Sequence, residues 1–88
     1  EEVLENKLSI FPNPASNSAA IELNLVESNE VVIEVLNTLG QIVFTYASNM
    51  SAGLNTIELP VGTLNAGLFY VNIKVANEMM TEKLNIIK

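Results

Sequence analysis

The chain has 88 residues, of which 49% are hydrophobic and 16% charged, and its formal net charge is −6. It contains no His, Cys, Asp, Arg or Trp, so every acidic residue is Glu and every basic residue is Lys. This composition indicates one small folded domain. It excludes Ser/His and Cys/His nucleophile pairs, Cys/His zinc sites, EF-hand loops and Walker-type magnesium sites. We therefore expect no cofactor and no enzymatic activity.

The acidic charge also argues against two classes of partner. Nucleic acids and anionic membrane surfaces attract clustered Lys and Arg, and the sequence has no basic cluster. The apolar runs are too short to cross a bilayer, so we expect no membrane insertion. The first seven residues, EEVLENK, are acidic and do not resemble a signal peptide. If the domain is exported, its address lies elsewhere in the sequence.

Apolar and polar residues alternate with a period of two, which is typical of strands with one buried face. Turn-forming residues divide the alternating segments into seven predicted strands. These strands cover residues 7–11, 19–25, 31–36, 41–47, 55–59, 69–76 and 80–87. Their number and spacing predict an all-β fold, a seven-stranded antiparallel sandwich of the immunoglobulin-like kind.

The breaks between the strands have physical reasons. Pro12-Asn13-Pro14 removes two amide donors and ends the first strand. Gly40 can supply a positive φ in the short turn Thr38-Leu39-Gly40-Gln41. Ala-Gly-Leu occurs twice, around Gly53 and Gly67, and in both places a glycine turn leads into a strand. The last two strands flank 77–78 and predict a hairpin.

The alternation also separates core from surface. The residues predicted to be buried are Ile21, Leu23, Leu25, Val31, Ile33, Val35, Val71, Ile73, Val75, Leu84 and Ile86. Glu22, Glu34 and Glu58 fall between apolar neighbours, which favours a solvated strand face over a glycosidase carboxylate pair. Phe44 and Tyr46 share one face and could form a sugar platform, although packing is the commoner use of strand aromatics.

The strand edges suggest a further property. An open sandwich leaves unpaired edges that can pair with another chain. We therefore expect weak self-association or partner binding by strand addition.

Five segments, taken in order, are similar to one known series. They are FPNPA at 11–15, NTLGQIV at 37–43, SAGLN at 51–55, LNAGLFYV at 64–71 and KLNIIK at 83–88. Their order and spacing resemble the type A C-terminal sorting domain of the type IX (Por) secretion system. The resemblance covers residues 8–88, and it implies that residues 1–7 are a linker from an upstream cargo.

The resemblance implies an immunoglobulin-like sandwich that acts as an address. In the family, an N-terminal signal takes the cargo to the periplasm, and an outer-membrane translocon recognises the folded domain. A sortase commonly removes the domain and often joins the cargo to lipopolysaccharide. The cargo would then be secreted or held at the cell surface.

The resemblance also assigns residues. It places recognition in the last strand, at Lys83, Leu84 and Lys88. It assigns turn and fold roles to Pro12, Asn13, Pro14, Gly40, Gly53, Gly67 and Tyr70. The sequence departs from the family at Pro60-Val61-Gly62, where an acidic position is common. The alternative hypothesis is an immunoglobulin-like or fibronectin-like accessory module of an extracellular enzyme, either carbohydrate-binding or a spacer, because one sandwich fold serves many functions.

Overall fold

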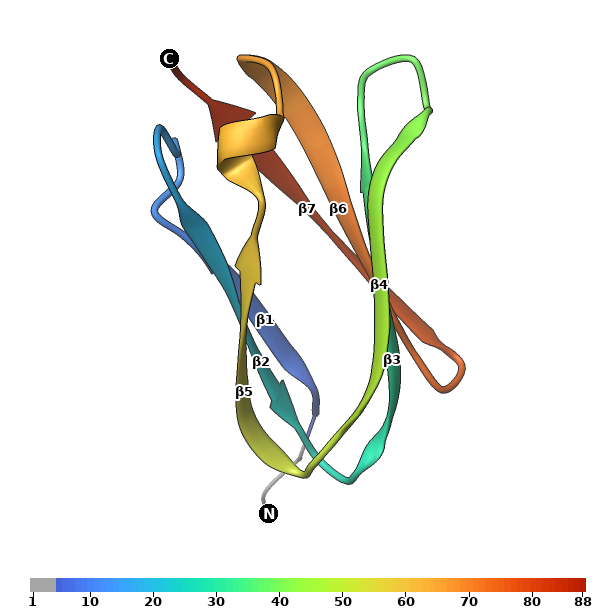
Figure 1. The fold of residues 1–88 in the computed structure, drawn as a ribbon. Helices are drawn as coiled ribbons and strands as arrows, with labels where there is room; N and C mark the ends of the chain where they lie inside the picture. The colour runs from blue at the N-terminus through green and yellow to red at the C-terminus, as the bar shows by residue number, and fades with distance from the viewer. Residues whose placement is uncertain (1–4) are drawn as a thin grey trace.

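The computed structural model describes residues 5–88, so Glu1–Leu4 of the predicted linker lie outside the described residues. Within these residues, seven strands form two antiparallel sheets that face each other, and one 3-10 turn lies between β5 and β6 (Figure 1). The strands are β1 (Lys7–Phe11), β2 (Ala19–Leu25), β3 (Asn29–Leu36), β4 (Ile42–Met50), β5 (Gly53–Leu59), β6 (Gly67–Val75) and β7 (Glu78–Ile86), and the 3-10 turn η1 is Val61–Thr63. One sheet has the order β1-β2-β5 and the other β4-β3-β6-β7. The predicted seven-stranded antiparallel sandwich is confirmed.

The core lies between the sheets and follows the predicted alternation. All eleven residues predicted to be buried are buried, and Ile33, Ile73 and Leu84 are among those fully enclosed. Seven further residues of the described part of the chain belong to the core: Ala15, Ala19, Met50, Leu59, Val61, Leu64 and Phe69. Several of these lie in loops or at strand ends, where no repeating pattern marks them. Burial of one such aliphatic or aromatic side chain stabilises the fold by about 1.5–3 kcal/mol.

β1 and β2 have the predicted bounds, and the other five strands differ from the prediction at one or both ends. Two of these differences have clear reasons. β4 continues to Met50, beyond the predicted end at residue 47, because residues 48–50 pair with residues 29–31 of β3. β6 ends at Val75 because Ala76 has a φ of 53° and begins the turn to β7. The predicted terminal hairpin is confirmed, with Val75 opposite Glu78.

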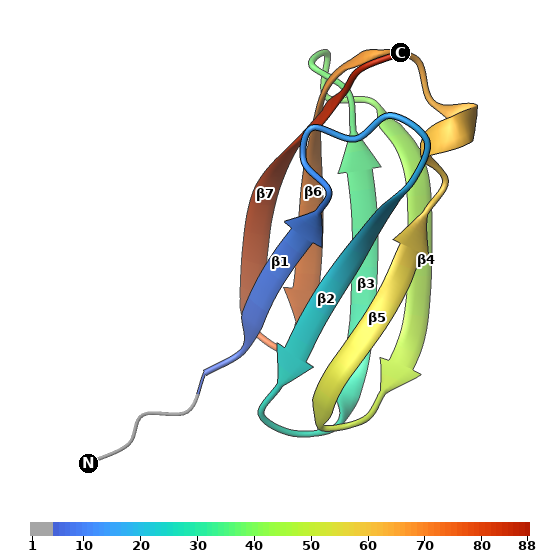
Figure 2. The same ribbon diagram turned by 90° about the vertical axis from the view of Figure 1, so that its left-hand side faces the viewer.

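The strands run alternately up and down, so the connections collect at two opposite ends of the sandwich (Figure 2). We call one the loop end; it consists of residues 12–18, 37–41, 60–66 and 87–88. We call the other the turn end; it consists of Asn6 and the short turns 26–28, 51–52 and 76–77. A nine-residue strand spans about 30 Å, which sets the approximate separation of the two ends.

Candidate recognition surface

The loop end unites most of the residues to which the sequence pointed. Pro12, Asn13 and Pro14 form the β1–β2 loop, Gly40 lies in the β3–β4 loop and Gly67 opens β6. Lys83, Leu84 and Lys88 belong to the last strand and tail, which finish at the same end (Figure 2). Gly53 is the exception, because it begins β5 at the turn end. Four of the five sequence segments therefore converge in space.

Asn13 fastens the first loop to the last strand. Its Nδ2 donates to the carbonyl oxygen of Lys83 at 2.8 Å, and its Oδ1 accepts from the Asn85 N–H at 3.1 Å. One amide side chain therefore satisfies a donor and an acceptor on the β7 edge that faces away from β6. The peptide bonds before Pro12 and Pro14 are both cis.

Ala15 continues this attachment along β7. Its N–H donates to the Asn85 carbonyl at 2.8 Å, and its carbonyl accepts from the Ile87 N–H at 2.7 Å. The side chain of Ala15 is fully buried, and the residue forms a parallel bridge with Ile86. The β1–β2 loop therefore closes the edge of β7 over its last residues, which links the two sheets at the loop end.

The three predicted recognition residues occupy different environments. Lys83 is exposed on the outer face of the four-stranded sheet, next to Tyr70 on β6. Leu84 is fully buried, so it positions β7 and does not present its side chain to a partner. Lys88 lies in the tail, where its Nζ donates to the Leu64 carbonyl and, at 3.4 Å, to the Gly62 carbonyl.

In the Pro60-Val61-Gly62 segment, Pro60 is the N-cap of η1 and the other two residues begin it; the sequence did not predict this turn. Thr63 closes the turn, because its Oγ1 and its N–H both donate to the Pro60 carbonyl, at 2.8 and 3.1 Å. Val61 is buried beneath it. The position that departs from the family pattern thus adds an apolar side chain to the core and offers the Gly62 carbonyl to Lys88.

The β3–β4 loop is organised by Asn37. Its Oδ1 accepts from the N–H groups of Leu39 and Gln41, both at 3.0 Å, while Gly40 has a φ of 83° as predicted. This network holds Leu39 at the tip with 82% of its surface exposed. No strand or helix pattern points to Asn37, but an Asn before a glycine turn is a known signal for a side-chain-closed turn.

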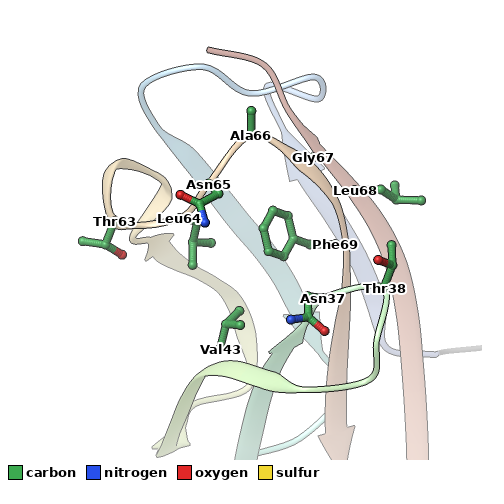
Figure 3. A pocket seen from close by; sticks show the side chains of 10 residues that line it. All are labelled: Asn37, Thr38, Val43, Thr63, Leu64, Asn65, Ala66, Gly67, Leu68 and Phe69. Atoms are coloured by element: carbon green, nitrogen blue, oxygen red, sulfur yellow. The ribbon is translucent and has the colours of Figure 1, made fainter.

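A groove lies between this loop and the segment that follows η1 (Figure 3). Its volume is about 490 Å³. Asn37 and Thr38 form one side, residues 63–66 form the other, and Phe69 lies between them (Figure 3). The exposed side chains of Val43 and Leu68 extend its apolar lining. The loop end is therefore a shaped, mixed apolar and polar surface.

Charge is distributed unequally between the two ends. The three loops of the loop end contain no charged residue, and the lysines of β7 and the tail lie beside them. Four carboxylates, those of Glu5, Glu27, Glu30 and Glu78, lie at or beside the turn end. Glu58, near the end of β5, and Glu82, next to Lys83, also lie near the loop end, so it is the loops themselves that lack negative charge.

The side chains that the sequence analysis considered for catalysis or sugar binding take part in the packing and surface of the sandwich. Glu34 forms an ion pair with Lys74 at 3.2 Å on the outer face. Phe44 packs against the core, while Tyr46, its neighbour on the same face, is 43% exposed at the sheet edge. Within residues 5–88, no three His, Cys, Asp or Glu side chains are grouped as metal ligands. The described part of the chain also has no helix long and apolar enough to cross a membrane.

Comparison with known proteins decides which family this fold represents. Residues 9–88 match the family described as the secretion system C-terminal sorting domain. The chain belongs to this family. It is a type IX secretion sorting signal, and this finding favours the sorting function over that of an accessory module. The machinery of type IX secretion recognises such a domain, whose role implies export to the cell surface or the extracellular space.

The solved structures agree on the fold. The sorting domain is similar to part of the crystal structure of dimeric latent PorU from Porphyromonas gingivalis, with a TM-score of 0.69 and 15% sequence identity. The match covers 97% of this chain and 10% of the PorU chain, so the likeness concerns one small part of a much longer protein. None of the curated proteins that were compared matches the chain.

Proposed function

We propose that the type IX translocon of the outer membrane recognises the loop end of this domain. The observation that supports the proposal is the convergence of four separated sequence segments at one end of the sandwich. That end combines exposed apolar side chains with the two C-terminal lysines and lacks carboxylates in its loops. A receptor can therefore approach it without meeting the acidic turn end.

The residues of the loop end have separate roles in this proposal. Lys83 contacts the receptor directly, because its ammonium group is exposed on a rigid strand. Lys88 holds the tail against η1 and presents its remaining donor capacity to the receptor. Leu84 acts indirectly by anchoring β7 in the core. Pro12, Asn13, Pro14, Gly40 and Gly67 shape the loops, while Gly53 and Tyr70 maintain the sandwich.

The turn end receives the cargo in this proposal. The described chain enters β1 at the turn end, where Asn6 Oδ1 accepts from the Val26 N–H at 2.8 Å. A cargo joined through residues 1–7 leaves the loop end free for the translocon. A sortase then cuts in the linker, after transit through the periplasm and the outer membrane, and the cargo is released or held at the cell surface.

The domain itself acts without catalysis in this proposal. The lack of His, Cys and Asp removes the usual nucleophile pairs, and none of the Glu side chains of residues 5–88 is buried. Assays of ester, glycoside and peptide hydrolysis should show no turnover. Turnover that survives repurification and disappears when a single Glu is changed to Gln would contradict this part of the proposal.

Export of a fusion protein tests the recognition surface. Residues 1–88 are attached to a periplasmic reporter in a bacterium with type IX secretion, and the reporter is measured in the periplasm, at the surface and in the medium. The double variant Lys83→Gln, Lys88→Gln should retain the reporter in the periplasm. The matched variant Lys7→Gln, Lys74→Gln makes the same change in charge elsewhere and should export normally.

Thermal melting of each variant separates loss of recognition from unfolding. A wild-type fusion that stays in the periplasm would show that residues 1–88 are not a sufficient signal. If the folded Lys83, Lys88 variant is exported like the wild type, these lysines are not recognised and the loop-end proposal fails.

We also infer that the domain associates weakly with itself through an unpaired strand edge. The support for this inference is the open arrangement of the two sheets, in which β1, β5, β4 and β7 are all edge strands.

A further inference from the structure

The four edge strands differ in how well they resist pairing with another chain. β1 has only five residues and begins with Lys7. β5 carries Glu58 near its end and is followed by Pro60. Short length, charged side chains and proline are the devices that natural sheets use to block an edge. These two edges are therefore protected.

β7 is protected in two ways. It carries Glu78, Glu82 and Lys83, and register places Glu82 opposite the fully buried Val71, on the inward face of the sheet. An inward-pointing charge on an edge strand is a known obstacle to strand addition. In addition, Asn13 and Ala15 occupy hydrogen-bonding groups along the last residues of this edge.

β4 lacks the short length, charged side chains and proline of the other edges, and its register shift against β3 is confined to the start of the strand, at residues 42–44. It is nine residues long and its sequence, IVFTYASNM, contains no charged residue, proline or glycine. Five of the nine residues are Ile, Val, Phe, Thr or Tyr, which favour strands. Ile42, Val43 and Tyr46 are 54%, 40% and 43% exposed. A long, uncharged, apolar edge is a site at which another strand adds.

We propose that β4 is a self-association surface, on which the β4 strand of a second copy pairs in antiparallel orientation. The proposal deepens the self-association inferred above and does not depend on recognition by the translocon. Antiparallel overlap of the regular part of β4 places Phe44 opposite Ser48 of the second copy. The two-fold axis then passes through Tyr46, and Thr45 lies opposite Ala47 of the second copy.

Charge allows a second copy to dock here despite the net charge of −6. Neither strand brings a Glu to the contact. The neighbouring strand β3 carries two carboxylates: Glu34, which is paired with Lys74 at 3.2 Å, and Glu30, which lies opposite Asn49 near the end of β4. Three strand spacings would separate β3 from its copy, about 14 Å. This exceeds the screening length of about 8 Å at physiological salt.

The small area of the contact predicts the affinity of the dimer. One pair of strands forms a small interface compared with the 1,200–2,000 Å² or so that stable complexes bury. The dimer should therefore be weak and depend on concentration. The aromatic pair of Tyr46 with its copy adds a favourable cross-strand contact at the axis.

Sedimentation analysis of the purified 88-residue chain over a wide concentration range tests the proposal. The wild type should show a reversible monomer–dimer equilibrium. The double variant Thr45→Lys, Ala47→Lys places like charges directly opposite each other across the axis, so dimerisation should weaken at least about tenfold. The matched control Thr56→Lys changes an exposed residue of the β5 edge and should dimerise like the wild type.

Cross-linking locates the axis independently. The chain has no cysteine, so Tyr46→Cys introduces a single thiol. Mild oxidation should trap a dimer of Tyr46→Cys far more efficiently than one of Thr56→Cys. A strictly monomeric wild type, a dimer that resists the two lysines, or equal cross-linking of both cysteine variants would each overturn the proposal. Circular dichroism of the lysine variants confirms that they remain folded.

Discussion

Asn13 follows β1 at the loop end and Asn6 precedes it at the turn end, and both side chains contact β7 or its turn. Asn13 bonds to two backbone groups of β7, at 2.8 and 3.1 Å. Asn6 instead donates to the side-chain carboxylate of Glu78 at 2.9 Å and accepts from the Val26 backbone. The loop end therefore fixes the backbone of the last strand, whereas the turn end is joined through a movable side chain.

This difference bears on function. At the loop end, the residues that complete the fold lie beside those proposed to contact the translocon: Leu84 is buried next to exposed Lys83. Loss of export after a change in β7 can therefore arise from unfolding or from lost recognition. The variants below therefore measure stability separately from export, so that unfolding can be distinguished from lost recognition at each end.

The largest effect is expected from Leu84→Ala. Its side chain is fully buried, so truncation leaves a cavity and should lower the free energy of unfolding by about 2–5 kcal/mol. Chemical denaturation measures this loss. Leu54→Ala is the matched control, because Leu54 is 63% exposed and its truncation should cost less than about 0.5 kcal/mol. Similar losses for both variants would contradict the assigned core.

Asn13→Ala and Asn6→Ala compare the two ends directly. Asn13→Ala removes two bonds to a strand backbone and should cost about 1–2 kcal/mol, since each net hydrogen bond contributes about 0.5–1.5 kcal/mol. Asn6→Ala should cost less, because one of its partners is a solvated carboxylate. Chemical denaturation of both variants shows which one loses more free energy of unfolding. Asn17→Ala, in the same loop as Asn13, is the control, and a larger loss for Asn6→Ala would reverse the comparison.

The sequence predicted the regular part of this fold far better than its ends. Alternation placed Ile21, Ile33 and Ile73 in the core because strand side chains change face at every residue. Alternation did not predict the burial of Val61 and Ala15, because both lie in connections between strands, where no repeating pattern exists. The double hydrogen bond of Asn13 could not be predicted either, because it depends on a strand 70 residues away.

The candidate surface was predicted in part. The family resemblance pointed to Lys83, Leu84 and Lys88, and alternation predicted correctly that Leu84 is buried. Only the fold shows that the Lys88 side chain donates to the Leu64 and Gly62 carbonyls. Sequence alone also predicted edges that could pair, without distinguishing among them. That distinction required the sheet order, which makes β4 an edge and β3 a central strand.

Gly40→Ala tests the shape of the loop end with a smaller expected effect. Gly40 has a φ of 83°, where a residue with a Cβ is strained, so the change should cost about 1 kcal/mol. Gly62→Ala, also at the loop end, is the control, because it has no positive φ and its Cβ would meet nothing within 4 Å. Thermal melting compares them. Equal melting temperatures would show that the loop does not need this conformation.

The smallest effect is expected from the charges of the turn end. Glu27 and Glu30 lie there with Glu5 and Glu78, and like charges on one surface repel. The double variant Glu27→Gln, Glu30→Gln should therefore raise the free energy of unfolding, by no more than about 0.5 kcal/mol for such surface sites. The gain in the free energy of unfolding should shrink as salt is added, because ionic strength screens exposed charges.

Glu58→Gln is the control, because Glu58 lies near the loop end, whose loops carry no charge. At low salt it should raise the free energy of unfolding less than the double variant does. Denaturation at low and high ionic strength measures both, and equal gains for the two variants would mean that the acidic charge acts on the whole molecule and not on the turn end.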